Sequence, residues 1–397
     1  MDIMITTTEE LKKLIDQLME EDFVTIDTEF IREFTYYPQL CLIQIAPGSG
    51  GQAYAVDPLA KGIDLSPFKK LFKDKNIVKV FHSAEQDIEM FYNALETIPL
   101  PLFDTQIAGQ VLGYGEAASY ATIVKDICRE SLDKSSRFTD WARRPLNEKQ
   151  ITYALSDVTY LRDVYKNFAQ RLKEKGREKW IDEDVKELTN PERYQNDPKD
   201  AWQRFKTKHS SPTFLGILKE VAKWREETAQ KRNVPRNRII RDDGISEIAA
   251  EEPTTIEDLK QLRRIHEKTI EKHGEEIIKA VKKGRRFPIK SIFKRFRPEP
   301  KQVADSEALF TLMRVLLKRQ CEKHNVAQKL VATMDEIKEL SCLNEHELRK
   351  SKSHIMHGWR GEVFGKYVLK LMSGKLALMV QDNEVCLLEQ QPEEKWD

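Results

Sequence analysis

Long apolar runs are missing from this sequence, and so is a secretion signal. No hydrophobic stretch approaches the about 20 residues that a membrane-spanning helix needs. The first residues lack the basic segment and the following apolar segment that mark a protein for export. We therefore expect no association with membranes and a cytoplasmic location.

Cysteine is scarce and scattered. The five cysteines are widely spaced, form no CxxC pair and are odd in number. This pattern argues against a disulfide framework and against a structural zinc site. It fits a reducing cytoplasm; the five residues are Cys41, Cys128, Cys321, Cys342 and Cys386.

A net charge close to zero hides a gradient along the chain. The 397 residues, enough for two or three domains, carry a formal net charge of only +1. Residues 1–60 hold eleven Asp or Glu against three Lys or Arg, whereas residues 279–297 hold nine Lys or Arg and no acid. Such a gradient fits a metal site joined to a module that holds a polyanion. A solvated helix face and an ordinary linker would explain the same charges.

Strand and helix patterns alternate over the first 170 residues. Helical spacing of apolar residues covers residues 7–20, with Thr8 as the predicted N-cap, and a second helix covers residues 85–94. Apolar or alternating segments between turn signals have the character of strands. The pattern predicts an α/β domain with a mixed sheet flanked by helices. The predicted strands are residues 23–30, 40–46, 53–57 and 76–82.

The rest of the chain has mainly helical patterns, divided by two polar segments. A stretch rich in Asn and Pro precedes residue 198, and a basic linker covers residues 285–302. We therefore predict a first domain over residues 1–190 and helical domains over residues 198–284 and 303–397. The last of these ends in an alternating segment, residues 375–388, that predicts a hairpin.

Two carboxylates lie at the end of the first long strand. Asp27 and Glu29 are two residues apart, so both side chains point to the same side of the sheet. Two like charges this close repel each other unless a cation neutralises them. Oxygen ligands of this kind suit Mg²⁺ or Mn²⁺. A solvated turn at the strand end is the alternative interpretation.

Three further residues extend this pattern. Asp87 lies one turn inside a helix that follows a strand, where an acid would also stabilise the helix dipole. Tyr153 and Asp157 are four residues apart and share one face of a helix, which could equally be amphipathic with a half-buried tyrosine. Each alternative is reasonable alone. Their joint occurrence, in this order, favours one site.

These residues match the three exonuclease motifs of the DEDD superfamily in its tyrosine branch. The sequence resembles the bacterial ribonuclease D family closely in the segments around them, including Thr35-Tyr-Tyr-Pro-Gln, Thr139-Asp-Trp and Arg144-Pro-Leu. The histidine branch carries a histidine five residues before the last aspartate, where this chain has Thr152. The resemblance covers residues 5–170 most strongly.

The helical part also resembles this family. Residues 215–232, followed by Asn233-Val-Pro, resemble the opening of an HRDC domain, and Gly358 to Gly365 resembles the end of a second, degenerate one. The resemblance implies an RNase H-like exonuclease domain followed by two all-α HRDC-type domains, with the boundaries given above.

The resemblance also implies a reaction and a set of roles. Two divalent metal ions, Mg²⁺ or Mn²⁺, would bind the carboxylates, with Asp27 bridging both, Glu29 and Asp157 on the ion that holds the attacking water, and Asp87 on the other. Tyr153 would orient the water, because a phenol with a pKa near ~10 is a weak base. The expected activity is that of a monomeric 3′–5′ exoribonuclease that acts on single-stranded 3′ ends, matures tRNA precursors and releases nucleoside 5′-monophosphates.

Substrate contacts are expected from two regions. Phe30 and His82 flank the motifs and could line the substrate groove, with Phe30 stacking on a base or serving as a core aromatic. The basic segment could grip phosphates or be a solvated helix whose aromatics pack inward. Its candidate residues are Arg285, Arg286, Lys294 and Arg295.

Two other functions remain compatible with the sequence. The same carboxylates could cut DNA, and contacts to the 2′-hydroxyl would separate the two substrates. A non-catalytic nucleic-acid scaffold built from HRDC modules is the second alternative. The presence of all four carboxylates and Tyr153 argues against it.

Overall fold

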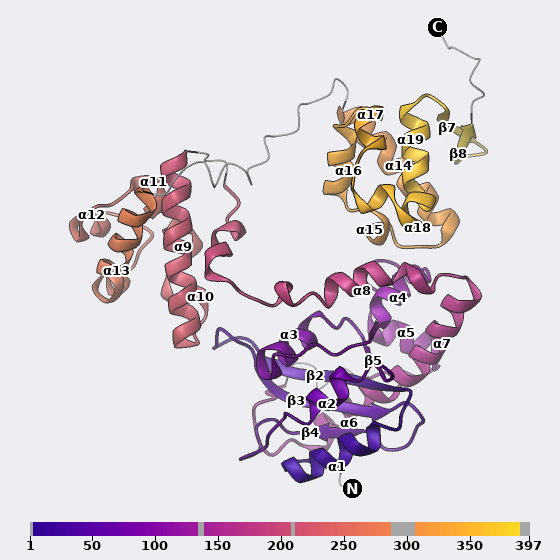
Figure 1. Ribbon diagram of the computed structural model, residues 1–397, viewed down its shortest axis with the longest axis horizontal. Helices are drawn as coiled ribbons and strands as arrows, with labels where there is room; N and C mark the ends of the chain where they lie inside the picture. The colour runs from indigo at the N-terminus through magenta and orange to yellow at the C-terminus, as the bar shows by residue number, and fades with distance from the viewer. Residues whose placement is uncertain (1–2, 134–138, 208–210, 287–305, 390–397) are drawn as a thin grey trace.

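A computed structural model describes residues 3–133, 139–207, 211–286 and 306–389. These form an α/β domain followed by two helical domains (Figure 1). Among the described residues, no helix is both long and apolar enough to span a bilayer. Most of the basic linker, including Lys294 and Arg295, lies outside the described residues.

The α/β domain is built on a mixed sheet. Its strands lie in the order β1-β4-β3-β2-β5-β6. Strand β3 is antiparallel to both of its neighbours, β2 and β4, whereas β1 is parallel to β4, and β5 and β6 are parallel to β2. The central strand β2 therefore has the antiparallel β3 on one side and the parallel β5 on the other. The bounds are β1 (Met4–Ile5), β2 (Phe23–Ile31), β3 (Gln39–Pro47), β4 (Tyr54–Val56), β5 (Val78–Phe81) and β6 (Leu102–Asp104).

Helices cover both faces of this sheet, as predicted. One face packs against α1 (Thr8–Leu18), α2 (Phe68–Lys73) and α3 (Glu85–Leu95). The other packs against α4 (Thr105–Val111), α5 (Tyr120–Ile127), α6 (Glu148–Thr159) and α7 (Leu161–Glu174). Alternate residues of β2 therefore belong to different cores, since strand side chains point to opposite faces.

The predicted N-cap of α1 is wrong by one residue. Thr7 caps the helix, and its side chain forms a reciprocal capping box with Glu10. Thr8 is the first helical residue, and its hydroxyl accepts a hydrogen bond from the backbone N–H of Asp64 at 2.9 Å. A cap at Thr8 would place Leu11 at the third helical position, where no side chain can return a hydrogen bond, whereas a cap at Thr7 places Glu10 there.

Short helices lead from the sheet domain to the first helical domain. The connecting helices are η1 (Glu178–Trp180), α8 (Asp182–Leu188), η2 (Pro191–Arg193) and η3 (Pro198–Arg204). The domain consists of α9 (Pro212–Arg232), α10 (Arg236–Ile239), α11 (Asp242–Glu251), α12 (Ile256–Lys260) and α13 (Glu267–Arg285) around one hydrophobic core.

This first helical domain contacts the loop between β2 and β3. The hydroxyl of Tyr36 donates a hydrogen bond to Glu226 and accepts one from Arg236 at 2.8 Å. The Arg236 guanidinium also lies 4.6 Å from the centre of the Tyr36 ring. Because Glu226 is 1% exposed, this contact is a buried polar one that sets the orientation of the two domains.

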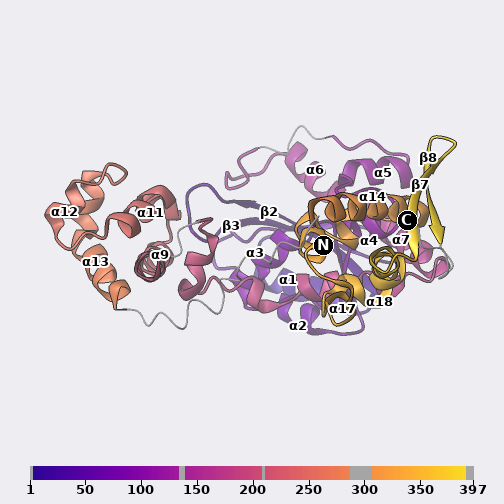
Figure 2. The same ribbon diagram turned by 90° about the horizontal axis from the view of Figure 1, so that it is seen from above.

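The second helical domain shares a hydrophobic core with the sheet domain. Figures 1 and 2 show it over α4 and α7, well apart from α9–α13. Trp180 and Trp359 stack across this interface with ring centres 4.3 Å apart. Its elements are α14 (Ser306–His324), α15 (Gln328–Val331), α16 (Met334–Ser341), α17 (Glu345–Arg349), η5 (His354–Met356), α18 (Gly358–Arg360), the π-helical turn η6 (Gly361–Gly365) and α19 (Lys366–Met372).

The predicted hairpin closes this domain. Strands β7 (Leu376–Gln381) and β8 (Glu384–Glu389) pair in antiparallel register, which confirms the prediction from the alternating pattern.

Candidate active site

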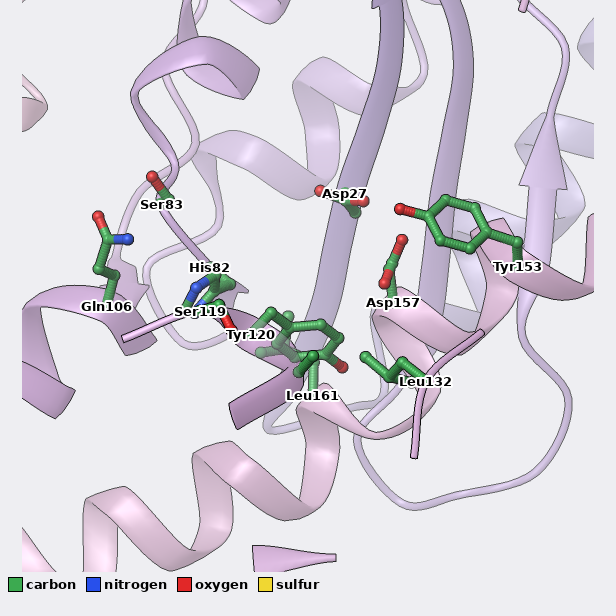
Figure 3. Close-up of a pocket in the computed structure, with 11 residues that line it drawn as sticks. Asp27, His82, Ser83, Gln106, Ser119, Tyr120, Leu132, Tyr153, Asp157 and Leu161 are labelled. Atoms are coloured by element: carbon green, nitrogen blue, oxygen red, sulfur yellow. The ribbon is translucent and has the colours of Figure 1, made fainter. Parts of the chain in front are cut away.

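Three carboxylates from two elements come together on the face of the sheet that α6 covers. Oxygens of Asp27 and Glu29 on β2 and of Asp157 on α6 lie within 4.8 Å of one another. Figure 3 shows Asp27, Asp157 and the Tyr153 hydroxyl converging on one space. Three partly buried carboxylates at such distances repel one another, and hard divalent cations prefer oxygen ligands of this kind. The residues present therefore fit a divalent cation.

Two threonines of β2 attach the flanking helices to the strand. Thr25 Oγ1 donates a hydrogen bond of 2.7 Å to the carbonyl of Val158, directly after Asp157. On the opposite face, Thr28 Oγ1 donates a hydrogen bond of 2.5 Å to Asp87 Oδ1 on α3. Both contacts are buried. They set the distance of α6 and α3 from the strand that carries Asp27.

Asp87 stands apart from the three-carboxylate group. It belongs to α3, and its side chain is buried and accepts a hydrogen bond from Thr28. Burial, and next the charge of Asp27, raise the pKa of Asp87 well above its ordinary value. Asp87 is thus close enough to Asp27 to respond to its charge.

Burial also changes the acidity of Asp27. It raises the pKa of this carboxyl from 3.8 to about 7, against a backbone hydrogen bond from Thr28 that lowers it. A nearby cation would favour the ionised form and oppose this rise. Protons and cations therefore compete for the Asp27 carboxylate.

Tyr153 is held by the segment that precedes α6. Its ring lies 6.2 Å from that of the buried Trp141. Arg144, from the same segment, makes two hydrogen bonds of 2.7 and 2.6 Å to the Asp57 carboxylate after β4. A third hydrogen bond of 2.6 Å joins Arg144 to the carbonyl of Cys41. The hydrogen bonds of Arg144 to Asp57 and Cys41 hold the segment before α6 against the sheet, so Trp141 packs beside Tyr153 in a defined position.

A pocket of about 360 Å³ opens beside the cluster. Asp27, Asp157 and Tyr153 form one wall (Figure 3). The opposite wall is polar, includes one histidine and has no carboxylate, and apolar side chains lie between the two walls. The further lining residues are His82, Ser83, Gln106, Ser119, Tyr120, Ala121, Leu132 and Leu161.

The polar wall depends on Asp104, which sequence reasoning missed. Its carboxylate accepts hydrogen bonds from the backbone N–H groups of Ser83, Ala84 and Gln106 at 3.1, 2.8 and 2.7 Å. Ser83 has a φ of 63°, a left-handed conformation that non-glycine residues adopt only when held. The segment Leu102-Phe-Asp-Thr-Gln was visible in the sequence, but nothing local showed that Asp104 would reach the turn before α3.

Tyr120 is the second residue that sequence reasoning missed. It lines the pocket, and its ring lies 5.3 Å from that of His82. Burial raises the pKa of its phenol well above the ordinary value, and the charges of Asp157 and Asp27 add to the effect. Tyr120 therefore stays neutral as a hydrogen-bonding group beside the cluster. Its sequence position offered no signal beyond the start of a helix.

The predicted substrate-binding residues have different surroundings. His82 lines the pocket, where its Nδ1 lies 3.0 Å from the Thr105 hydroxyl and burial lowers its pKa. Phe30 is partly buried with the Arg32 guanidinium 5.3 Å from its ring centre, and it does not line this pocket. Arg285 ends α13 in an ion pair of 3.1 Å with Glu252. Arg286 is exposed.

Known families match two parts of the chain. A 3′–5′ exonuclease family matches residues 3–173, and the HRDC domain family matches residues 214–281. Ribonuclease D of Nitrobacter hamburgensis is 41% identical over 97% of this chain and 99% of its own length. The chain belongs to the ribonuclease D family. Ribonuclease D of a Jannaschia species is also 41% identical over the same shares of both chains.

Solved structures agree with this assignment. Escherichia coli RNase D, described as an exoribonuclease involved in structured RNA processing, is 29% identical with a TM-score of 0.76, covering 94% of this chain and 99% of its own. The catalytic core of RRP6 from Trypanosoma brucei, 23% identical with a TM-score of 0.54 over 71% of this chain and 79% of its own, shares the fold. The protein is accordingly a 3′–5′ exoribonuclease with an exonuclease domain and an HRDC domain.

Proposed function

We propose that the carboxylate cluster holds two divalent cations, Mg²⁺ or Mn²⁺, and that the pocket beside it takes the 3′-terminal nucleotide of RNA. The observation that carries the proposal is the convergence of three carboxylates, from a strand and a helix, at the mouth of a polar pocket. The proposed ligands are Asp27, Glu29, Asp157 and, on the outer side, Asp87.

The cations and the side chains have separate tasks. When bound, two divalent cations would lower the pKa of the attacking water and stabilise the charge on the entering and leaving oxygens. Tyr153, whose hydroxyl converges with Asp27 and Asp157, orients the water. Asp87, which accepts a hydrogen bond from Thr28, would support the second cation. The products are nucleoside 5′-monophosphates.

The pocket supports a specificity for single-stranded ends. A volume of about 360 Å³ accommodates one nucleotide rather than a base pair. We propose that His82, on the polar wall, and Phe30, directly after Glu29 on β2, line the substrate groove, with Phe30 stacking on a base. We propose 3′-extended tRNA precursors as the substrate class and a monomer as the acting species.

A second HRDC-like domain over residues 303–397 is part of the proposal. Helices α9 and α14 are followed directly by Asn233 and Asn325, both left-handed with φ values of 48° and 49°. Each is followed by a valine and a four-residue helix, α10 or α15. Helices α12 and α17 both begin with a capping box, on Thr255 and Asn344. The long α13 has no single counterpart, because α18, η6 and α19 replace it.

The remaining domain boundaries are proposed as predicted: residues 1–190 for catalysis, 198–284 for the first HRDC domain and 285–302 for a basic linker that binds RNA. Arg285 closes α13 with its guanidinium on Glu252, whereas the exposed Arg286 is available to a phosphate. Lys294 and Arg295 are proposed to act in the same way.

A substrate comparison tests the proposal. Wild-type protein should trim 3′-extended tRNA and linear single-stranded RNA faster than single-stranded DNA, with Mg²⁺ or Mn²⁺ and not with EDTA. Asp157→Asn should abolish trimming, whereas Asp163→Asn, an exposed carboxylate on α7, should leave it unchanged. Trimming by Asp157→Asn at the wild-type rate would show that the site is misassigned. Faster cutting of DNA would favour the DNA exonuclease.

A further inference from the structure

Gln44 is a buried polar side chain without a partner. It lies on β3, its exposed fraction is 0%, and neither its amide nitrogen nor its amide oxygen has a hydrogen-bond partner among the described residues. A side-chain amide can donate two hydrogen bonds and accept two. Leaving such a group unsatisfied in a protein interior is unfavourable, so its retention needs a reason.

The register of the sheet places Gln44 beside the carboxylate cluster. Gln44 pairs directly with Asp27 across β3 and β2, and paired residues of antiparallel strands point to the same face. Its neighbours two residues away, Leu42 and Ala46, pack with Ala154 and Val158 of α6. The Gln44 amide therefore lies between the sheet and α6, on the side where Asp27 meets Asp157.

We propose that Gln44 is a positioning residue for the cation site: with a cation bound, its amide N–H would donate to the Asp27 carboxylate, or its carbonyl would accept from water around the cation. This inference rests on the proposed function of the cluster. An amide is suited to the position because it adds a donor and an acceptor without adding charge. A carboxylate there would increase the repulsion within the cluster, and an apolar side chain would leave Asp27 without this donor.

The surroundings of Gln44 distinguish this role from a structural one. Apart from the polar side chains of β2, its neighbours on this face are apolar, so a leucine of similar volume would fit the same space. Removing an unpartnered amide from an apolar site should then stabilise the cation-free protein. If Gln44 were retained because it stabilises the fold, its replacement by leucine would instead destabilise the cation-free protein. The structure therefore points to a group that is retained for binding at the expense of stability.

The experiment compares Gln44→Leu with a matched control. Gln320 on α14 is also 0% exposed, with both amide atoms unpartnered among the described residues, but it belongs to the second helical domain. For wild type, Gln44→Leu and Gln320→Leu, the Tm is measured in EDTA, and Mn²⁺ affinity is measured by calorimetry on the full chain without RNA. We expect Gln44→Leu to raise the Tm in EDTA and to weaken Mn²⁺ binding by roughly 10- to 100-fold. Gln320→Leu should bind Mn²⁺ with the wild-type affinity.

Two results would overturn the proposal. One is a Mn²⁺ affinity of Gln44→Leu within about twofold of wild type. The other is a lower Tm of Gln44→Leu in EDTA, which would assign Gln44 to the fold. Asp27→Asn separates this failure from failure of the site itself: if Asp27→Asn binds Mn²⁺ as wild type does, the cluster is not the cation site. If Asp27→Asn loses the ion and Gln44→Leu keeps it, the inference about Gln44 alone is wrong.

Discussion

Replacing Asp27 by Asn should stabilise the cation-free protein at neutral pH while removing its activity. Burial raises the pKa of Asp27 from 3.8 to about 7, so the ionised side chain is unfavourable in the folded state. A rise of this size corresponds to ~4 kcal/mol at 1.36 kcal/mol per pKa unit. Water at the pocket mouth screens the charge and makes this an upper limit. Asn has the same shape and carries no charge.

The sign of the pH dependence follows from the order of deprotonation. Well below pH ~4, Asp27 is protonated in both the folded and the unfolded chain, and its charge has no effect. As pH rises, the unfolded chain releases this proton first, so the folded state loses stability until pH passes about 7. The free energy of unfolding of wild type should fall relative to Asp27→Asn over this range. The charge of Asp27 also raises the pKa of Asp87, so the substitution relieves that repulsion too.

The assay is urea unfolding in EDTA from pH 5 to 8. A pulse of hydrogen exchange at one fixed pH, read on peptides from β2 and α6, reports the exonuclease domain separately from the helical domains. Asp16→Asn, an exposed carboxylate on α1, controls for the change in net charge. Saturating Mg²⁺ should make wild type more stable than Asp27→Asn, since only wild type gains binding free energy. If the difference in free energy of unfolding between wild type and Asp27→Asn in EDTA did not change with pH, the reasoning would be refuted.

Three further predictions concern groups around the site. Tyr153→Phe should lower kcat on the order of 10²-fold, while the Kd for single-stranded RNA in EDTA stays within about twofold; an equal loss of both would assign the tyrosine to the fold. Tyr36→Phe should weaken docking of the first helical domain onto the sheet domain by about 1–3 kcal/mol, because the Tyr36 hydroxyl donates a hydrogen bond to the buried Glu226. Faster hydrogen exchange confined to the β2–β3 loop and α9 would demonstrate this weaker docking. Arg286→Ala should reduce the slope of log affinity for RNA against log salt by about 0.7, and Arg285→Ala should change it less because that guanidinium is paired with Glu252.

Local patterns were sufficient for much of the fold. Apolar periodicity predicted α1, α3, the predominantly helical remainder and the terminal hairpin, because each depends on residues that are near one another in the sequence. The wrong N-cap of α1 shows where this approach fails. Thr7 and Thr8 are equivalent in type, and the reciprocal contact with Glu10 distinguishes them.

Segments that the sequence presented as family markers gain a physical reason from the structure. Tyr36, within Thr35-Tyr-Tyr-Pro-Gln, carries the polar contact to the first helical domain. Arg144, in Arg144-Pro-Leu, fastens the segment before α6 to Asp57. Neither partner could be inferred from the sequence, because both contacts join segments that are distant along the chain.

The sequence by itself determined which side chains are available for chemistry and which of them share a face. Strand and helix periodicity place Asp27 with Glu29, and Tyr153 with Asp157, because these pairs lie within single elements. The tertiary structure alone decided that the two pairs meet. The hydrogen bond from Thr25 to Val158 joins residues 133 positions apart and brings Asp157 to Asp27. Strand register likewise decided that Gln44 lies beside Asp27, since pairing across strands depends on packing that no local pattern encodes.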